Sequence, residues 1–309
     1  MKEKTAYHHP VLLKEAVAGL AIVAEGTYVD VTFGGGGHSK AILQQLGPEG
    51  RLLAFDQDSD ALKNAIDDAR FQLIHGNFKH LKRFLKFYGI AKVDGILGDF
   101  GVSSHQFDEA ARGFSTRFNA QLDMRMDQNT ALSAKEVINT YSEASLANML
   151  FTYGELRSAK GMASAMVNHR SQRPLRTTED LKRAIARFLP RGKENRTLAQ
   201  VYQAIRIEVN QEMDALKDFL LQVPEVLKDK GRLSVISYHS LEDRLVKRFI
   251  REGKFEGVAE KDFYGNVQVP LRKVGSLITP SPEELTSNNR ARSAKLRIAV
   301  KNESPAQKK

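Results

Sequence analysis

The stretch DVTFGGGGHSKAIL, Asp30–Leu43, places four consecutive glycines between a short apolar run and a helix-like segment. A strand that ends in glycines and opens a helix brings bare backbone close to a bound ligand. A dinucleotide-binding turn requires Gly-x-Gly-x-x-Gly, but the place of its third glycine is taken by Ser39 or Lys40, depending on the register. The stretch therefore predicts either a turn that binds a nucleotide-like ligand or a purely structural turn, and the dinucleotide fingerprint is broken.

Short apolar runs alternate with helix-like segments around this turn. Four of the runs have the composition of buried strands: Thr27–Phe33, Arg51–Asp56, Phe71–Gly76 and Val93–Phe100. Helical patterns, such as the one at Ser59–Ala69, separate them. This alternation predicts βαβ units and a parallel sheet.

The strand pattern stops between about Asp108 and Ile207, where helices and loops are expected. It resumes with a helix whose apolar face is formed by Val209, Met213, Leu216 and Leu220. A buried strand at Arg232–Tyr238 and two closing strands, VQVPLRKV and AKLRIAVK, follow. We therefore predict one doubly wound α/β sheet that is interrupted by a helical insertion.

The composition restricts the chemistry. The 309 residues include 47 Lys and Arg against 37 Asp and Glu, a formal net charge of +10, which indicates a polyanionic partner such as nucleic acid or simply a basic protein without one. Cysteine is absent, which excludes disulfides, thiolate metal sites, iron–sulfur clusters and a cysteine nucleophile.

No apolar run in the sequence is long enough to cross a bilayer. The segment Ala16–Ala24 has the length of a signal-peptide core, but Glu15 and Glu25 flank it. We interpret it as a helix end followed by a turn. The sequence thus predicts a cytoplasmic protein with no membrane partner.

Acidic residues end two of the expected strands. Asp56 lies twenty residues after Gly36, where an acid accepts hydrogen bonds from ribose hydroxyls, or else it only caps the next helix. Asp99 ends the fourth strand, and ligands of open α/β sheets bind beyond such ends. Phe78 follows the third strand and either lies against a purine or packs in the core. With the dinucleotide fingerprint broken, S-adenosylmethionine is the favoured cofactor, and no metal is expected.

The segment ISYHSLEDR follows the strand at Arg232–Tyr238. Ser240 is expected to cap a helix, with Asp243 completing the capping box. For His239, two roles stay open: contact with a substrate base, or a structural hydrogen bond.

Several distinctive stretches follow one another along the chain, among them TFGGGGHS, LLAFDQD, GDFGVSSHQFD, RGFS, LDMRMD and VISYHSLEDR. In this order they resemble the RsmH/MraW family, S-adenosylmethionine-dependent methyltransferases that act on the N4 amino group of a cytidine in 16S ribosomal RNA. The resemblance implies a Rossmann-like class I methyltransferase sheet with an inserted helical domain, which agrees with the break in the strand pattern. We therefore expect the sheet to be formed by residues 1–108 and 208–309, and an inserted helical RNA-binding domain at 109–207. The resemblance also implies cofactor contacts at Gly36, Gly37, His38, Asp56, Phe78, Asp99 and Gln106, of which His38 and Gln106 are indicated by the resemblance alone.

The chemistry of methyl transfer to a cytidine amino group points to further candidate residues. A cytosine amino group is a poor nucleophile, so an acceptor for one of its hydrogens would help, and Asp99 or a neighbouring carbonyl is the candidate. His239 is the second candidate catalytic residue. The segment Arg170–Arg196 holds nine Lys and Arg against three Asp and Glu, so Arg173, Arg176 and Arg183 either grip RNA phosphates or belong to a solvated helix face.

Two competing functions stay open from sequence. One is a nicotinamide-dependent oxidoreductase, against which the broken fingerprint argues. The other is a basic RNA-binding or assembly factor with a vestigial cofactor pocket. The expected partner is 16S ribosomal RNA or the small ribosomal subunit, and the oligomeric state is left open between monomer and homodimer.

Overall fold

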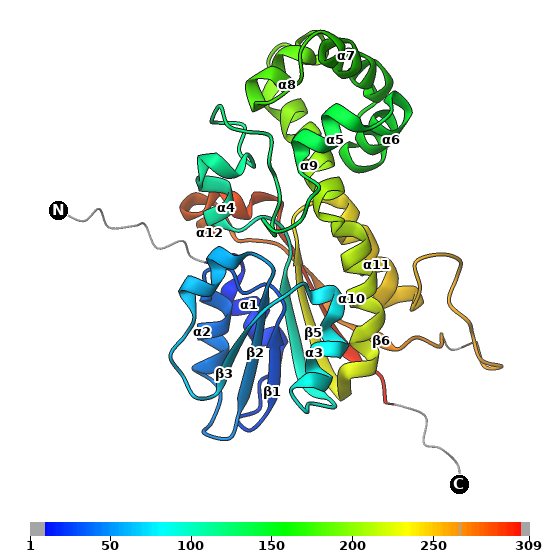
Figure 1. The fold of residues 1–309 in the computed structure, drawn as a ribbon. Helices are drawn as coiled ribbons and strands as arrows, with labels where there is room; N and C mark the ends of the chain where they lie inside the picture. The colour runs from blue at the N-terminus through cyan, green and yellow to red at the C-terminus, as the bar shows by residue number, and fades with distance from the viewer. Residues whose placement is uncertain (1–9, 266, 304–309) are drawn as a thin grey trace. The chain divides into compact units, whose positions relative to one another are not determined.

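A computed structural model describes residues 10–265 and 267–303 (Figure 1). The chain divides into two compact units: one runs up to Gly101 and resumes at Asp214, and the other is Val102–Met213. The second unit therefore begins before and ends after the insertion at 109–207 that the sequence pattern suggests. Among the described residues, no helix has both the length and the apolar character that a membrane crossing requires.

The first unit contains a seven-stranded sheet with the order β3-β2-β1-β4-β5-β7-β6. Its strands are β1 Thr27–Asp30, β2 Arg51–Asp56, β3 Phe71–His75, β4 Val93–Asp99, β5 Leu227–Ser237, β6 Leu271–Ile278 and β7 Lys295–Lys301. Strands β1 to β5 pair in parallel, and β7 is antiparallel to both β5 and β6. The expected Rossmann-like class I sheet is thereby confirmed, with segments from both sides of the insertion joined in it (Figure 1).

The sheet forms because its central strands are apolar along almost their whole length, as parallel strands buried on both faces must be. Leu52–Phe55 of β2 and Gly95–Gly98 of β4 are buried without interruption. In β1, Val29 pairs with Leu53 on one side and with Ile96 on the other. This register brings the carboxyl ends of β1, β2 and β4 to the same edge of the sheet.

The unit that contains the sheet also contains helices. They are α1 Leu13–Gly19, α2 Gly37–Leu43, α3 Leu81–Phe87, α10 Glu212–Val226, whose first two residues belong to the other unit, α11 Ser240–Glu252 and α12 Pro282–Ser287. Helix α1 approaches closely, since a Cβ on Gly19 would lie 2.7 Å from Ile298 Cδ1. Ser234 Oγ also donates a hydrogen bond to the Ala16 carbonyl at 2.8 Å. The segment at Ala16–Ala24 is thus a helix end and a turn, as expected.

The second unit is helical and has its own apolar core. Its helices are α4 Ser104–Asp108, α5 Ala134–Thr140, α6 Glu143–Gly154, α7 Ala159–Gln172, α8 Thr178–Ala184 and α9 Glu194–Asn210. It also contains short 3-10 helices at Ala110–Arg112 and Ala186–Phe188, and those of the first unit lie at Ser59–Asn64, Phe78–His80 and Asn289–Ser293. Leu150, Met162 and Ile205 are fully buried in this core, and Met124 and Met126 join it.

Two expected helices differ from the observed ones. The apolar stripe from Val209 to Leu220 spans two helices, because Gln211 adopts a left-handed conformation with φ of 50° and separates α9 from α10. The pattern that begins at Ser59 forms only a 3-10 helix, which ends at Asn64. Beyond it, the Asp68 carboxylate binds the backbone and guanidinium of Arg70, and such local side-chain bonds compete with helix formation.

Candidate active site at the carboxyl edge of the sheet

The glycine turn after β1 exposes backbone at one position. Gly34 and Gly36 have φ of 52° and 75°, in the left-handed region that glycine enters without strain. A Cβ on Gly36 would lie 2.9 Å from the Phe33 ring, whereas a Cβ on Gly35 would meet nothing within 4 Å. The turn is therefore packed on one side and open at Gly35.

Asp56 connects this turn to the end of β2. Its Oδ2 accepts a hydrogen bond from the Gly34 amide and its Oδ1 accepts one from the Asp58 amide, both at 2.8 Å. The cap of the following 3-10 helix is Asp58, not Asp56. Burial raises the pKa of Asp56 to about 6, although both amide hydrogen bonds oppose the shift. Each carboxylate oxygen has a second lone pair with which it can accept a hydroxyl.

Asp99, at the end of β4, is held by three neighbours. Its Oδ1 accepts a hydrogen bond from the Tyr238 hydroxyl at 2.8 Å, and its amide donates to Thr32 Oγ1 at 2.6 Å. His38 Nδ1 lies 3.7 Å from Asp99 Oδ2, and the other ring nitrogen of His38 lies 3.2 Å from the Val11 carbonyl. The structure thus brings Asp99 and His38 together.

The electrostatics around Asp99 are set mainly by burial, which raises its pKa to about 6. The nearby carboxylates of Asp30 and Glu242 raise this pKa further, while His38 and Tyr238 lower it. For Tyr238, burial and the adjacent Asp99 charge hold the pKa well above its usual value, so the phenol stays a donor.

Asp30 is a third acid at this edge, because it ends β1 and is fully buried. Ser39 Oγ donates to its Oδ2 at 2.7 Å, and the Thr32 amide donates to its Oδ1 at 3.1 Å. Burial raises the pKa of Asp30, and its charge in turn raises the pKa values of Asp56 and Asp99. Three carboxyl groups therefore occupy one edge of the sheet, and the charge of Asp30 acts on the other two, which disfavours an anionic ligand there.

Phe78 belongs to an aromatic cluster next to this edge. Its ring centroid lies 5.4 Å from that of Phe100 and 5.5 Å from that of Phe219. The side chain is only half-buried. Part of its ring is buried by packing against these two phenylalanines. The rest is exposed, and contact of that part with a purine stays a prediction.

The capping box of α11 is shifted by one residue from the expected one. Ser240 is the first helical residue, and the N-cap is His239, whose Nδ1 accepts from the Glu242 amide at 3.4 Å. Glu242 Oε2 accepts in return from the amides of Tyr238 and His239, at 2.8 Å and 3.3 Å. The reason is that Asp243, the expected partner of Ser240, pairs instead with Arg297 at 2.7 Å.

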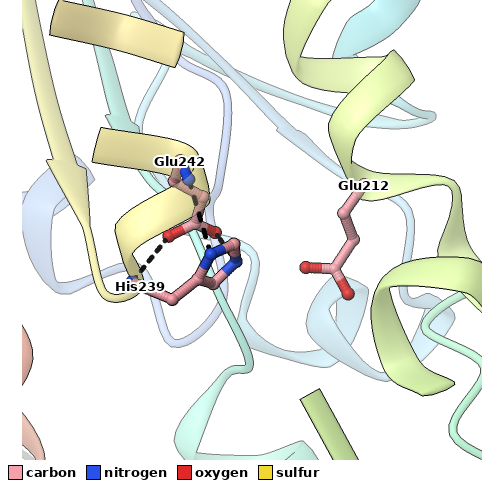
Figure 2. Close-up of side chains that lie close together, drawn as sticks. All are labelled: Glu212, His239 and Glu242. Carbon is pink, nitrogen blue, oxygen red and sulfur yellow. Dashed lines mark hydrogen bonds and ion pairs between the residues drawn. The ribbon is translucent and has the colours of Figure 1, made fainter. Parts of the chain in front are cut away.

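His239 thus has a structural hydrogen bond within the capping box (Figure 2). Its Nε2 lies 3.1 Å from Glu242 Oε1, but the pair is not aligned as a hydrogen bond. The contact with a substrate base stays a prediction. Glu212, also drawn in Figure 2, belongs to the second unit and forms an ion pair with Arg206 at 2.8 Å.

The remaining predicted residues lie in the second unit. Gln106 is buried and forms a capping box with Ser103, in which each residue's side chain accepts from the other's amide. Arg173, Arg176 and Arg183 are exposed, and Arg183 Nε lies 3.3 Å from Glu179. Their roles in binding cofactor and RNA stay predictions.

Comparison with known proteins identifies the family. The family model described as "MraW methylase family" matches residues 5–302. The chain belongs to the MraW methylase family. A relative in this family from Christiangramia forsetii, named "Ribosomal RNA small subunit methyltransferase H", is 64% identical over 295 residues, which cover 96% of this chain and 98% of the relative. Proteins of the same name from Flavobacterium johnsoniae and Bacteroides fragilis are 61% and 51% identical, over 96% and 97% of this chain and 98% and 99% of theirs.

Two residues at the carboxyl edge of this MraW family member are not indicated by the sequence reasoning. Asp30 lies inside the strand expected at Thr27–Phe33, and it becomes a strand-end acid only because β1 ends there. Tyr238 contacts Asp99 across 139 positions of sequence, and only the pairing of β4 with β5 reveals this contact.

Proposed function

We propose that this MraW family member transfers the methyl group of S-adenosylmethionine to N4, the exocyclic amino group, of a cytidine in 16S ribosomal RNA. The observation that carries the proposal is its 64% identity, over 96% of the chain, to a protein named ribosomal RNA small subunit methyltransferase H. The substrate partner is then the small ribosomal subunit or its RNA, and we infer a cytoplasmic location from that partner.

The strand-end carboxylates support the choice of cofactor. Asp30, Asp56 and Asp99 make the carboxyl edge acidic, and acidic groups attract a cation and repel a pyrophosphate. S-adenosylmethionine supplies a methyl group on a positively charged sulfonium and has no phosphate. The acidic edge therefore fits this cofactor better than it fits a nicotinamide dinucleotide.

The proposed cofactor contacts follow from the geometry of the edge. Asp56 accepts the ribose hydroxyls through the free lone pairs of its two oxygens. The open turn allows close approach of the ligand to backbone, and Phe78 offers the exposed part of its ring to the purine. The full proposed set is Gly36, Gly37, His38, Asp56, Phe78, Asp99 and Gln106.

Asp99 is the proposed acceptor for a hydrogen of the target amine. Tyr238 donates to its Oδ1, which leaves Oδ2, the oxygen that faces His38, for the amine. With a pKa of about 6 the carboxyl is ionised at neutral pH and can accept. The alternatives stay a neighbouring carbonyl as the acceptor and His239 as a contact to the base. Alignment of the two reactants is the chain's main contribution to such a displacement.

Mass spectrometry of ribosomal RNA nucleosides tests the proposal. We expect N4-methylated cytidine from 16S ribosomal RNA to decrease when the gene is deleted and to return when the wild-type chain is expressed. An unchanged nucleoside profile in the deletion strain would exclude the proposed activity. Calorimetry with S-adenosylmethionine and with NAD separates it from an oxidoreductase.

Cofactor affinity should depend on pH. The ionised form of Asp56 accepts the ribose hydroxyls, and burial places its pKa at about 6. As pH falls below about 6, protonation removes the acceptor, so the dissociation constant for S-adenosylmethionine should rise by about tenfold per pH unit for one carboxylate. Calorimetry between pH 5 and pH 8 measures this. A flat profile would show that no strand-end carboxylate needs to be ionised for binding.

Charge reversal at Arg173, Arg176 and Arg183 should weaken RNA binding. If each arginine neutralises one phosphate of single-stranded RNA, the slope of log affinity against log salt should fall by about 2. Filter binding to 16S ribosomal RNA at several salt concentrations measures the slope. The matched control reverses Lys135, Arg157 and Lys160, which are exposed cations in the same unit. Equal effects of the two triple variants would assign the arginines to a solvated face.

A further inference from the structure

A row of side chains crosses the last three strands of the sheet at the end opposite the glycine turn. Arg232 of β5 pairs with Val300 of β7, and Val300 pairs on its other side with Arg272 of β6. Side chains of directly paired residues on neighbouring strands lie on the same face of a sheet. The two arginines therefore flank Val300 on one face.

Helix α1 lies on this face of the sheet. It covers the neighbouring row of side chains but leaves the row of Arg232, Val300 and Arg272 uncovered. It contacts Ser234 and Ile298, which pair with each other and lie two residues along their strands from Arg232 and Val300. Beyond the helix, the strands leave a hollow of about 470 Å³. We call it the basic hollow, and its lining residues are Lys230, Arg232, Arg272, Lys273, Val274 and Val300. All of its charged lining residues are cations.

Acidic side chains near the basic hollow already have cationic partners. Asp94 pairs with Lys228 at 2.8 Å, and Asp229 pairs with Lys301 at 3.5 Å. Glu303 reaches the rim, where it pairs with Lys230 at 2.9 Å, and both of these side chains are largely exposed.

The other three cations of the basic hollow differ in this respect. Within residues 10–265 and 267–303, Arg232, Arg272 and Lys273 form no ion pair. Arg272 and Lys273 are exposed, and Arg232 is half-buried beside Val300. Neighbouring cations without acids repel one another, and an anion placed between them would relieve that repulsion. The hollow thus combines uncompensated positive charge with an apolar floor.

We propose that the basic hollow binds the phosphodiester backbone of the RNA substrate. This inference rests on the proposed function and adds to it a second RNA contact, on the unit that contains the sheet. Arginine suits the role because its planar guanidinium binds phosphate oxygens in pairs. Arg232 precedes the carboxyl end of β5, at Ser237, by about 16 Å of strand. The hollow therefore contacts nucleotides some distance along the RNA from the methylated base.

The test compares two charge reversals of equal size. The first variant is Arg272→Glu with Lys273→Glu, both exposed on the edge strand β6. The control is Arg83→Glu with Lys86→Glu, both exposed on α3 of the same unit. Binding is measured on small ribosomal subunits, and on the RNA extracted from them, taken from a strain that lacks this gene. The salt slope should fall by about 1.4 in the first variant and stay at the wild-type value in the control.

At low salt, the first variant should bind RNA at least about tenfold more weakly than the control. Its S-adenosylmethionine affinity by calorimetry should equal that of the wild type, because the strand-end acids are untouched. Arg232→Gln, which removes charge without reversal, should give a smaller loss of the same kind.

Three outcomes would overturn the assignment. The first is an unchanged salt slope in the first variant, and the second is an equal loss of RNA affinity in the first variant and the control. The third is that millimolar inorganic phosphate abolishes the difference in RNA affinity between the wild type and the first variant, which would indicate a site for free phosphate. Methylation of the same subunits by the wild-type chain is followed in parallel. If the wild type methylates them and the variants bind normally, only the basic hollow proposal fails. If the wild type does not methylate them, the proposed function fails.

Discussion

Asp99→Ala will lower the single-turnover rate of methyl transfer by at least about a hundredfold at saturating cofactor. The expected size is that of a lost acceptor for a proton in the transition state. The variant also leaves the buried hydroxyl of Tyr238 without its partner, which lies at 2.8 Å in the wild type. Rapid quenching with radiolabelled S-adenosylmethionine, on small subunits from a strain that lacks the gene, measures the rate.

Tyr238→Phe is the matched variant, because it keeps the carboxylate of Asp99 and removes only its phenolic donor. The hydrogen bond from Tyr238 lowers the pKa of Asp99, so its loss should raise that pKa above about 6. The acidic limb of the rate profile should then move to higher pH, with a fall in rate at neutral pH of about tenfold or less. If Asp99→Ala instead weakened cofactor binding but reacted at the wild-type rate once saturated, Asp99 would be a cofactor ligand only.

The sheet could be predicted because its strands are defined by local composition. The expected bounds of β2, Arg51–Asp56, agree with the structure, and β1, β3 and β4 begin at the expected residues. Parallel strands place their carboxyl ends at one edge, so the juxtaposition of Asp56 with the glycine turn follows from the alternation of strands and helices. Burial of these acids, which sets their pKa values, depends on the packed helices and is not encoded in the spacing.

The parts that sequence reasoning missed depend on conformation or on distant pairing. Gln211 is not a residue type, such as glycine, that marks a left-handed backbone in the sequence. Its left-handed conformation nevertheless divides one apolar stripe into two helices. The cap at His239 replaces the one expected at Ser240 because the competing acid, Asp243, is attracted to Arg297 on β7. Arg232 and Arg272 become neighbours only through Val300, which lies far from both in sequence. Long-range strand pairing therefore creates the basic hollow without a motif.

Asp56→Ala will raise the dissociation constant for S-adenosylmethionine by about a hundredfold or more. Each hydrogen bond to a charged acceptor contributes about 1.5–3 kcal/mol, and two ribose hydroxyls are expected to bind this carboxylate. The substitution also frees the amide of Gly34, which the carboxylate holds at 2.8 Å, so the turn loses an anchor. Isothermal calorimetry measures the affinity, and thermal unfolding without ligand checks that the variant folds.

Asp67→Ala is the control for this prediction, because it removes an equal charge from an exposed position in the segment that follows β2. It should bind S-adenosylmethionine as the wild type does, since long-range attraction from an exposed carboxylate is screened by salt. Asp56→Asn keeps the shape of the side chain, but its NH₂ group would face one of the two backbone amides that the carboxylate accepts from. Two donors cannot form a hydrogen bond with each other, so this variant should also bind S-adenosylmethionine more weakly. A folded Asp56→Ala chain with wild-type affinity would place the ribose away from β2. The acidic edge would then act on the ligand only through its charge.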